Sequence, residues 1–174
     1  AAAGGRTEMS DLVFDLDEAG RFDLCFRDAA LATGDDVTTA ILVSLFTDRR
    51  ANPDDELPAG GGDRRGWWGD AFPTPVLGTE PEQDRIGSRL WLLSRALAIP
   101  ETLVRAQQYA EEALSWMIDD KIASAVTVEA SFPQPGWLML AVAVDRPDGR
   151  RTEAAWTINW EAQILRPTVA GKIG

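Results

Sequence analysis

The last third of the chain most constrains the fold, because its residues alternate with the period of β-strands. Residues 125–130 and 152–160 read as extended segments, and residues 137–144 are almost wholly apolar. The dipeptide Asp148-Gly149, which is typical of tight hairpin turns, closes the connection between the second and third segments. These patterns predict a three-stranded antiparallel meander within residues 124–163, followed by an extended tail over residues 164–174.

Two helices are expected directly before this sheet. The apolar residues of the first recur every three or four positions, which predicts one helix face: Ile86, Leu90, Leu93 and Leu97. The second opens with Pro100-Glu101, which suits a first helical turn, and ends near Asp120-Lys121. Helices packed on a small C-terminal antiparallel sheet indicate the α+β fold class.

The N-terminal part predicts less regular structure. Residues 11–27 alternate weakly around turn residues 17–20, which favours a short hairpin or two extended pieces. A helix is expected over residues 40–46, after several N-cap candidates in residues 35–39. Residues 1–8 precede Met9, which looks like a natural start, and are interpreted as a vector remnant. Residues 9–174 are expected to form a single domain, with helices and loop in 9–123.

Residues 51–82 are rich in proline and glycine, so regular structure should be scarce there. Yet the segment also holds Trp67, Trp68 and Phe72, and a flexible linker rarely carries adjacent tryptophans. We therefore expect a long ordered loop whose rings pack on a surface. Gly60-Gly61-Gly62 is expected to be its mobile part.

Composition excludes several classes of function. The chain has no histidine and one cysteine, Cys25, so Ser-His-Asp catalysis, His-bearing metal sites and an intrachain disulfide are ruled out. With 28 acidic and 17 basic residues, the formal net charge of −11 opposes binding to nucleic acid or anionic membranes. No apolar run approaches the roughly 18 residues of a membrane span. No cofactor, nucleic acid or membrane partner is expected.

The strongest local feature is the run Asp63-Arg64-Arg65-Gly66-Trp67-Trp68-Gly69-Asp70. Arginine pairs with aspartate and stacks on tryptophan, and both Arg and Trp are enriched at interface hot spots. One interpretation is a recognition loop for a partner protein. The other is a loop pinned onto its own core by its tryptophans, and the sequence leaves both open.

Other motifs carry weaker signals. Gly87-Ser88-Arg89-Leu90-Trp91 lies at an expected helix start, where it could hold an anion, but tight packing against the tryptophan loop is favoured. Two carboxylate pairs could serve a glycosidase, although a solvated surface explains them better: Glu80 with Glu82, and Glu111 with Glu112.

In three stretches the chain resembles the Mu-like baseplate wedge proteins of contractile phages, relatives of the small "lysozyme-like" wedge subunit. The stretches are residues 39–51, the specific run of residues 63–70, and residues 87–93 followed by 109–114. The resemblance covers roughly residues 10–130, with a compatible β ending. Many relatives carry a Glu-Pro-Arg motif after the long helix, where this chain has Asp119-Asp120-Lys121, so the contacts of that motif are not carried over.

The resemblance implies a structural, non-enzymatic subunit of the virion tail, assembled in the host cytoplasm and present in multiple copies. Its partners would be other wedge and hub proteins and the tail sheath or tube, with the strands at 124–160 open to strand exchange with the sheath. The residues expected to bind partners are Arg64, Arg65, Trp67, Trp68, Asp70, Arg89, Trp91, Trp156 and Trp160.

Two other functions compete with this reading. A peptidoglycan hydrolase using paired carboxylates would need a glutamate with a raised pKa in a cleft. A small acidic binding module that mimics nucleic acid would need its acidic residues gathered on one face. Here they are spread along the chain, which disfavours the second alternative.

Overall fold

A computed structural model describes the chain over the segments that carry its core. These are residues 11–12, 14–16, 22–24, 26–27, 30–31, 33–34, 36–58, 62–67, 86–159 and 164–168. The expected vector remnant, residues 1–8, lies outside them, as do residues 59–61 and 68–85 of the long loop. The described parts of that loop contain no helix or strand, as its proline and glycine content predicts.

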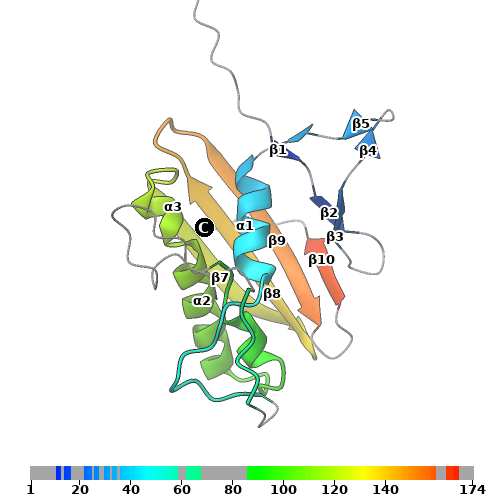
Figure 1. Ribbon diagram of the computed structural model, residues 1–174, viewed down its shortest axis with the longest axis vertical. Helices are drawn as coiled ribbons and strands as arrows, with labels where there is room; N and C mark the ends of the chain where they lie inside the picture. The colour runs from blue at the N-terminus through cyan, green and yellow to red at the C-terminus, as the bar shows by residue number, and fades with distance from the viewer. Residues whose placement is uncertain are drawn as a thin grey trace, which may run out of the picture.

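The C-terminal sheet is antiparallel and has four strands in the order β10-β9-β8-β7 (Figure 1). The strands are β7 (Ala125–Gln134), β8 (Trp137–Asp145), β9 (Arg151–Asn159) and β10 (Ile164–Thr168). The expected meander is confirmed as β7, β8 and β9, while the three-strand count is wrong by one. The extended tail supplies β10, in which Pro167 pairs with Trp156. Proline lacks a ladder donor and is tolerated on an edge strand, so its presence hid this strand.

A tight turn connects β8 to β9. Between β8 and β9, the N–H of Arg146 donates to the carbonyl of Arg150 at 2.8 Å, and the N–H of Gly149 donates to the carbonyl of Arg146 at 3.0 Å. Gly149 has φ +83°, a conformation that glycine adopts without a steric cost. The Asp-Gly signal therefore located this turn correctly.

Three α-helices precede the sheet: α1 (Asp36–Phe46), α2 (Pro100–Leu114) and α3 (Trp116–Asp119). The prediction placed α1 and α2 well. Pro100 lies in the first turn of α2 with Glu101 behind it, where a fixed φ and an acidic side chain both suit a helix start. The helix expected to end near Asp120 is interrupted at Ser115, and Lys121 then takes φ +60°.

The helix expected over residues 86–97 is wrong. Only the 3₁₀ helix η2 (Leu90–Leu93) forms there, and all four of its residues are buried. Gly87 has φ +99°, and its position leaves no room for a side chain, because a Cβ would lie 2.3 Å from the carbonyl oxygen of Thr47. Ser88 forms a parallel bridge with Asp48 instead of starting a helix. Of the four regularly spaced apolar residues, Leu90 and Leu93 are buried, whereas Ile86 is 37% and Leu97 is 74% exposed.

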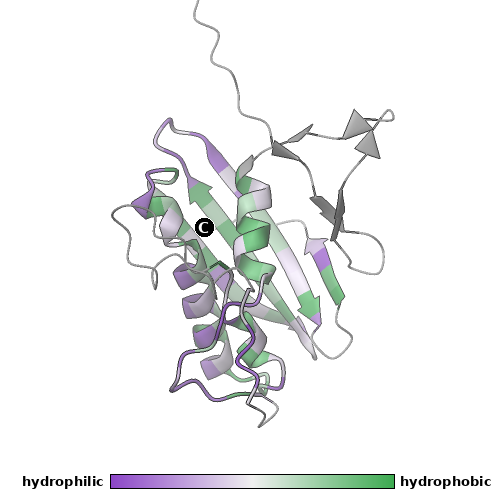
Figure 2. Cartoon of the chain, in the orientation of Figure 1, coloured by the Kyte–Doolittle hydropathy of each residue, from purple (hydrophilic) through white to green (hydrophobic). Residues whose placement is uncertain are grey.

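The core fills the space between the helices and one face of the sheet (Figure 1). Helix α2 packs mainly on β7, and α1 contacts β9. Figure 2 shows apolar residues concentrated on α1 and the central strands, and hydrophilic residues along the outer side of α2. The side chains that are fully buried in this core include Ile41, Leu45, Leu114, Met117, Leu138, Leu140, Val142 and Val144.

The N-terminal segment adds short antiparallel pairs. Strand β2 (Phe14–Leu16) pairs with β3 (Phe22–Leu24), which confirms the hairpin expected over residues 11–27. Strand β1 (Asp11–Leu12) pairs with β6 (Thr33–Gly34), and β4 (Phe26–Arg27) pairs with β5 (Ala30–Leu31). No helix in the described part of the chain is long and apolar enough to cross a membrane.

Candidate functional site

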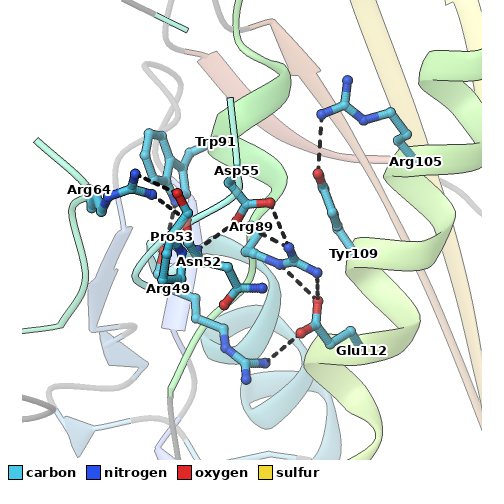
Figure 3. A network of polar contacts seen from close by, with 10 residues as sticks. All are labelled: Arg49, Asn52, Pro53, Asp55, Arg64, Arg89, Trp91, Arg105, Tyr109 and Glu112. Atoms are coloured by element: carbon cyan, nitrogen blue, oxygen red, sulfur yellow. Dashed lines mark hydrogen bonds and ion pairs between the residues drawn. The ribbon is translucent and has the colours of Figure 1, made fainter. Parts of the chain in front are cut away.

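The described end of the predicted recognition loop, residues 62–67, lies against residues 47–53. The N–H of Ala51 donates to the carbonyl of Arg64 at 2.9 Å. The guanidinium of Arg64 donates to the carbonyl of Asn52, and to that of Pro53 at 2.9 Å (Figure 3). Gly66 has φ +111°, and a Cβ there would lie 2.8 Å from the Cβ of Arg50. Glycine at position 66 therefore allows the two segments to approach.

Arg65 of the same loop contacts the start of η2. Its Nη1 lies 2.7 Å from Oδ2 of Asp48, and its guanidinium lies 4.6 Å from the ring centroid of Trp91. Trp91 is buried, and its Nε1 donates to the carbonyl of Arg49 at 2.8 Å. The expected pairing of arginine with aspartate and tryptophan is present, and the tryptophan is Trp91 of η2.

Arg89 lies at the centre of a second set of polar contacts (Figure 3). Its Nη1 donates to both carboxylate oxygens of Asp55 at 2.8 and 3.1 Å, and its Nε and Nη2 donate to Oε2 of Glu112 at 3.0 and 2.8 Å. The guanidinium also lies 4.6 Å from the ring centroid of Tyr109. Glu112 accepts a further ion pair from Arg49 at 3.3 Å.

The Arg89 contacts are largely shielded from solvent, since the side chains of Arg89 and Asp55 are only 17% and 11% exposed. Burial lowers the pKa of Arg89, but the hydrogen bonds and charges of Glu112 and Asp55 raise it by more, so its pKa lies above the ordinary value. The guanidinium therefore stays charged wherever the protein is folded. A buried charge that loses its partner is strongly destabilising, so these three residues depend on one another.

Together these contacts form what we call the arginine clamp: Arg49, Arg64, Arg65 and Arg89 with their partners Asp48, Asp55, Trp91 and Glu112. The clamp ties the loop over residues 47–67 to η2 and to α2. Ser88 adds to it, because its buried hydroxyl donates to the carbonyl of Leu45 at the end of α1. The clamp consists of side chains from the loop, η2 and α2, which are distant from one another in the sequence.

Four of the predicted partner-binding residues meet in this clamp: Arg64, Arg65, Arg89 and Trp91. Trp67 follows directly and is 40% exposed. Trp156 lies elsewhere, is 3% exposed, and packs edge to face on Phe46 at a centroid distance of 5.8 Å. Trp68, Asp70 and Trp160 lie outside the described residues. Both readings of the loop therefore have support, since its arginines bind the chain itself and Trp67 faces solvent.

Sequence reasoning missed half of the clamp. Asp48 and Arg49 entered only as part of the resembling stretch 39–51, Asp55 carried no motif, and Glu112 was read as part of a solvated helix face. That reading fits Glu111, which is exposed and accepts a hydrogen bond from Gln107. Glu112 lies three residues after Tyr109 on α2, so the two side chains share a face. This spacing was the available signal that Glu112 points toward the loop.

Catalytic and metal chemistry finds little support among the described residues. They hold no group of three or more acidic or cysteine side chains that could bind a metal ion. Both oxygens of Glu112 accept contacts from arginine, so this carboxylate is not free to act as a general acid. The other candidate pair, Glu80 and Glu82, lies outside the described residues.

Comparison with known proteins agrees with the resemblance seen in the sequence. The family described as "Phage protein GP46" matches residues 37–151, which contain the clamp and the strands β7 and β8. The chain is 49% identical over 131 residues to "Baseplate protein gp46" of Escherichia phage Mu, covering 75% of this chain and 83% of that protein. It is 39% identical over 152 residues to "Mu-like prophage FluMu protein gp46" of Haemophilus influenzae, covering 87% and 98%. The chain therefore belongs to the phage GP46 family of Mu-like baseplate proteins.

Proposed function

We propose that this chain is a structural subunit of a contractile phage-tail baseplate. Within the baseplate, the chain would form part of a wedge and link the hub, the wedge and the sheath. The observation that carries the proposal is the 49% identity to the baseplate protein of phage Mu over 83% of that protein. The subunit would be present in several copies in the tail of the virion, after assembly in the host cytoplasm.

The arginine clamp suits such a role. Assembly subunits must present surface loops in a fixed conformation, because ordering a loop during association costs binding free energy. Arg64 and Arg65 hold residues 62–67 in place, and Trp67 next to them is 40% exposed. Residues 62–67 are thus positioned in advance, and the partly exposed Trp67 ring belongs to a residue type that is enriched at interface hot spots.

Strand β7 suits the contact with the sheath. Within the described residues it pairs only with β8, so its outer edge has backbone groups that an added strand can bind. Residues 125–131 carry one charged side chain, Glu129, and so lack most devices that block edge pairing. The opposite edge strand, β10, has five residues against ten in β7, and a proline lies in each, Pro167 in β10 and Pro133 near the end of β7. We therefore assign the exchange to the edge of β7.

The alternative is a peptidoglycan hydrolase, and one experiment separates the two functions. Cells that produce the particle but lack this chain are expected to yield no complete contractile tails, as seen by negative-stain electron microscopy. A hydrolase would leave tails complete and impair only penetration of the cell wall. If cells that lack the chain produce complete tails that can contract, the structural proposal is overturned. In complemented cells, Glu111→Gln, in the exposed member of the candidate pair, tests the carboxylates separately: a hydrolase loses cell-wall digestion, whereas a structural subunit retains assembly.

A further inference from the structure

The outer edge of β7 is regular over residues 125–131 and irregular after them. The register with β8 is unbroken from Ala125 to Ser131 and shifts between Ser131 and Gln134. Pro133 lies in the irregular part and has no N–H to donate. A strand added at this edge can therefore form a regular ladder only along residues 125–131.

The side chains of β7 alternate between the two faces of the sheet. Val128 is 2% exposed, and Val126 and Ala130 are partly buried against the core, whereas Thr127 and Glu129 are exposed on the outer face. Strands that pair in one sheet share the same alternation. A strand added beside β7 must therefore place every second side chain on the core side and the others on the outer face.

Helix α2 covers the core side of β7, and Figure 1 shows it on the β7 side of the sheet, with α1 nearer β9. On α3, which follows α2, Nε1 of Trp116 donates to Oγ of Ser44 on α1 at 3.1 Å, so Trp116 faces α1. Ile118 lies two residues later, about 200° around the helix, and therefore points away from α1, toward the free edge.

A second apolar side chain lies on the same flank of the helices. Leu103 precedes Glu112 by about two and a half turns of α2, so the two point in opposite directions. Glu112 binds Arg49, just after α1, which leaves Leu103 on the flank toward the edge. Ile118 is 46% exposed and Leu103 is partly buried. Apolar side chains on the core side of an added strand would cover both, and burial of apolar surface is favourable.

The outer face of the same edge carries a negative charge. Glu129 is exposed and lies opposite Ala141 of β8, so its carboxylate faces no charge across that ladder. A strand on the free side places another residue directly beside Glu129, where an opposite charge stabilises the pair and a like charge destabilises it. The formal net charge of −11 also attracts a basic segment at long range.

We propose that the edge of β7 over residues 125–131 binds an amphipathic strand of another protein, with apolar residues at alternate positions facing Leu103 and Ile118 and a lysine or arginine beside Glu129. This inference rests on the proposed function, which assigns strand exchange to this edge, and adds the chemistry of the partner strand. Glu129 disfavours a second copy of this chain as the occupant, because the only charged side chain within residues 125–131 is acidic.

Glu129→Lys tests the charge in assembled particles and should reduce the occupancy of the chain in purified tails about tenfold, because it places two cations side by side. Glu153→Lys is the matched control, since it makes the same change on the same face of the sheet, on β9 and away from the edge. It should leave occupancy within about twofold of the wild type. Circular dichroism melts establish that each variant folds, and equal occupancy of the two folded variants would overturn the inference.

Ile118→Asp tests the apolar flank and should also reduce occupancy about tenfold, because a charge would be buried beneath the helix. Val43→Asp is its control, since Val43 is 43% exposed on α1 and lies away from the edge. The control should keep occupancy within about twofold. Equal losses in these two folded variants would mean that the flank of Ile118 does not contact the added strand.

A benzophenone amino acid at position 127 then identifies the strand. After irradiation of intact particles, mass spectrometry should find a cross-linked peptide that alternates apolar and polar residues and contains lysine or arginine. Reversing that cation to glutamate in the partner should restore the occupancy of Glu129→Lys. Cross-links to a second copy of this chain, to an acidic or non-alternating peptide, or to no protein would overturn the inference. Absence of the wild-type chain from tails would instead defeat the proposed function.

Discussion

At the scale of single residues, Arg89 connects the loop before η2 to helix α2. Its guanidinium binds Asp55 from the loop and Glu112 from α2, and it stacks on Tyr109. No hydrophobic contact can replace these bonds when the arginine is truncated, because Asp55 would lose its buried ion pair and Glu112 would keep only Arg49. The residue is a structural one, and its effect on function comes through the loop that it holds.

Arg89→Ala is expected to lower the free energy of unfolding by about 3 kcal/mol, the lower end of the cost of breaking a buried ion pair. Urea denaturation of the purified chain measures this change. Arg150→Ala is the matched control, because its partner Asp148 is exposed and surface pairs contribute little. Equal effects of the two substitutions would mean that the clamp does not hold the fold together.

Gly87 lies where the neighbouring backbone leaves no room for a side chain. Gly87→Ala should cost at least about 3 kcal/mol of unfolding free energy, because the methyl group meets the backbone of Thr47 at an already unusual φ. Gly149→Ala also has a positive φ but meets nothing within 4 Å, so it should cost only about 1–2 kcal/mol. Thermal or urea unfolding of both variants measures the difference, and similar costs would contradict the close approach of Gly87 to Thr47.

The carboxyl of Asp148 provides a pH-dependent signal. The backbone N–H of Arg150, and then its guanidinium, lower the pKa of Asp148 below its ordinary value of 3.8. A lowered pKa means that the stabilisation of the β8–β9 turn is present above the ordinary value and is lost as pH falls through the lowered one. An NMR titration should find this low midpoint. In Arg150→Ala it should rise only part of the way, because the backbone donor remains.

At the scale of elements, β10 completes the sheet and covers part of the core. Leu165 is buried on this strand and pairs with Ile158 of β9, whereas Arg166 is exposed. Leu165→Ala should therefore cost about 2–3 kcal/mol of unfolding free energy, as is typical for a buried leucine, and Arg166→Ala much less. Urea unfolding distinguishes them. Small and equal losses of unfolding free energy in the two variants would show that β10 packs only weakly on the rest of the sheet and core.

The elements also show what the sequence could and could not predict. Alternation located β9, an apolar run located β8, and turn residues separated the strands. Residues 140–144 of β8 are all buried, so this central strand is covered on both faces and its sequence does not alternate. Periodicity failed at residues 86–97, because Gly87 and Ser88 follow the backbone of residues 47–49 instead of a helix. Local patterns do not contain such long-range backbone contacts. The same limit explains why Asp55 and Glu112 were not recognised as partners of Arg89.

At the scale of the whole molecule, the chain separates a rigid body from the surfaces that we assign to assembly. The four-stranded sheet and the helices on one of its faces form the body, and the arginine clamp fixes the loop to it. Two surfaces then lie on different elements: the loop at Trp67 and the edge of β7. A subunit that joins several neighbours needs such separate contacts, since one patch binds one partner at a time.

Cryo-electron microscopy of the intact tail tests the central claim most directly. The account predicts that this chain occupies several equivalent positions in the baseplate, with a strand from a neighbouring sheath protein added along β7. A baseplate map without this chain, or tails in which mass spectrometry finds none of it, would contradict the account.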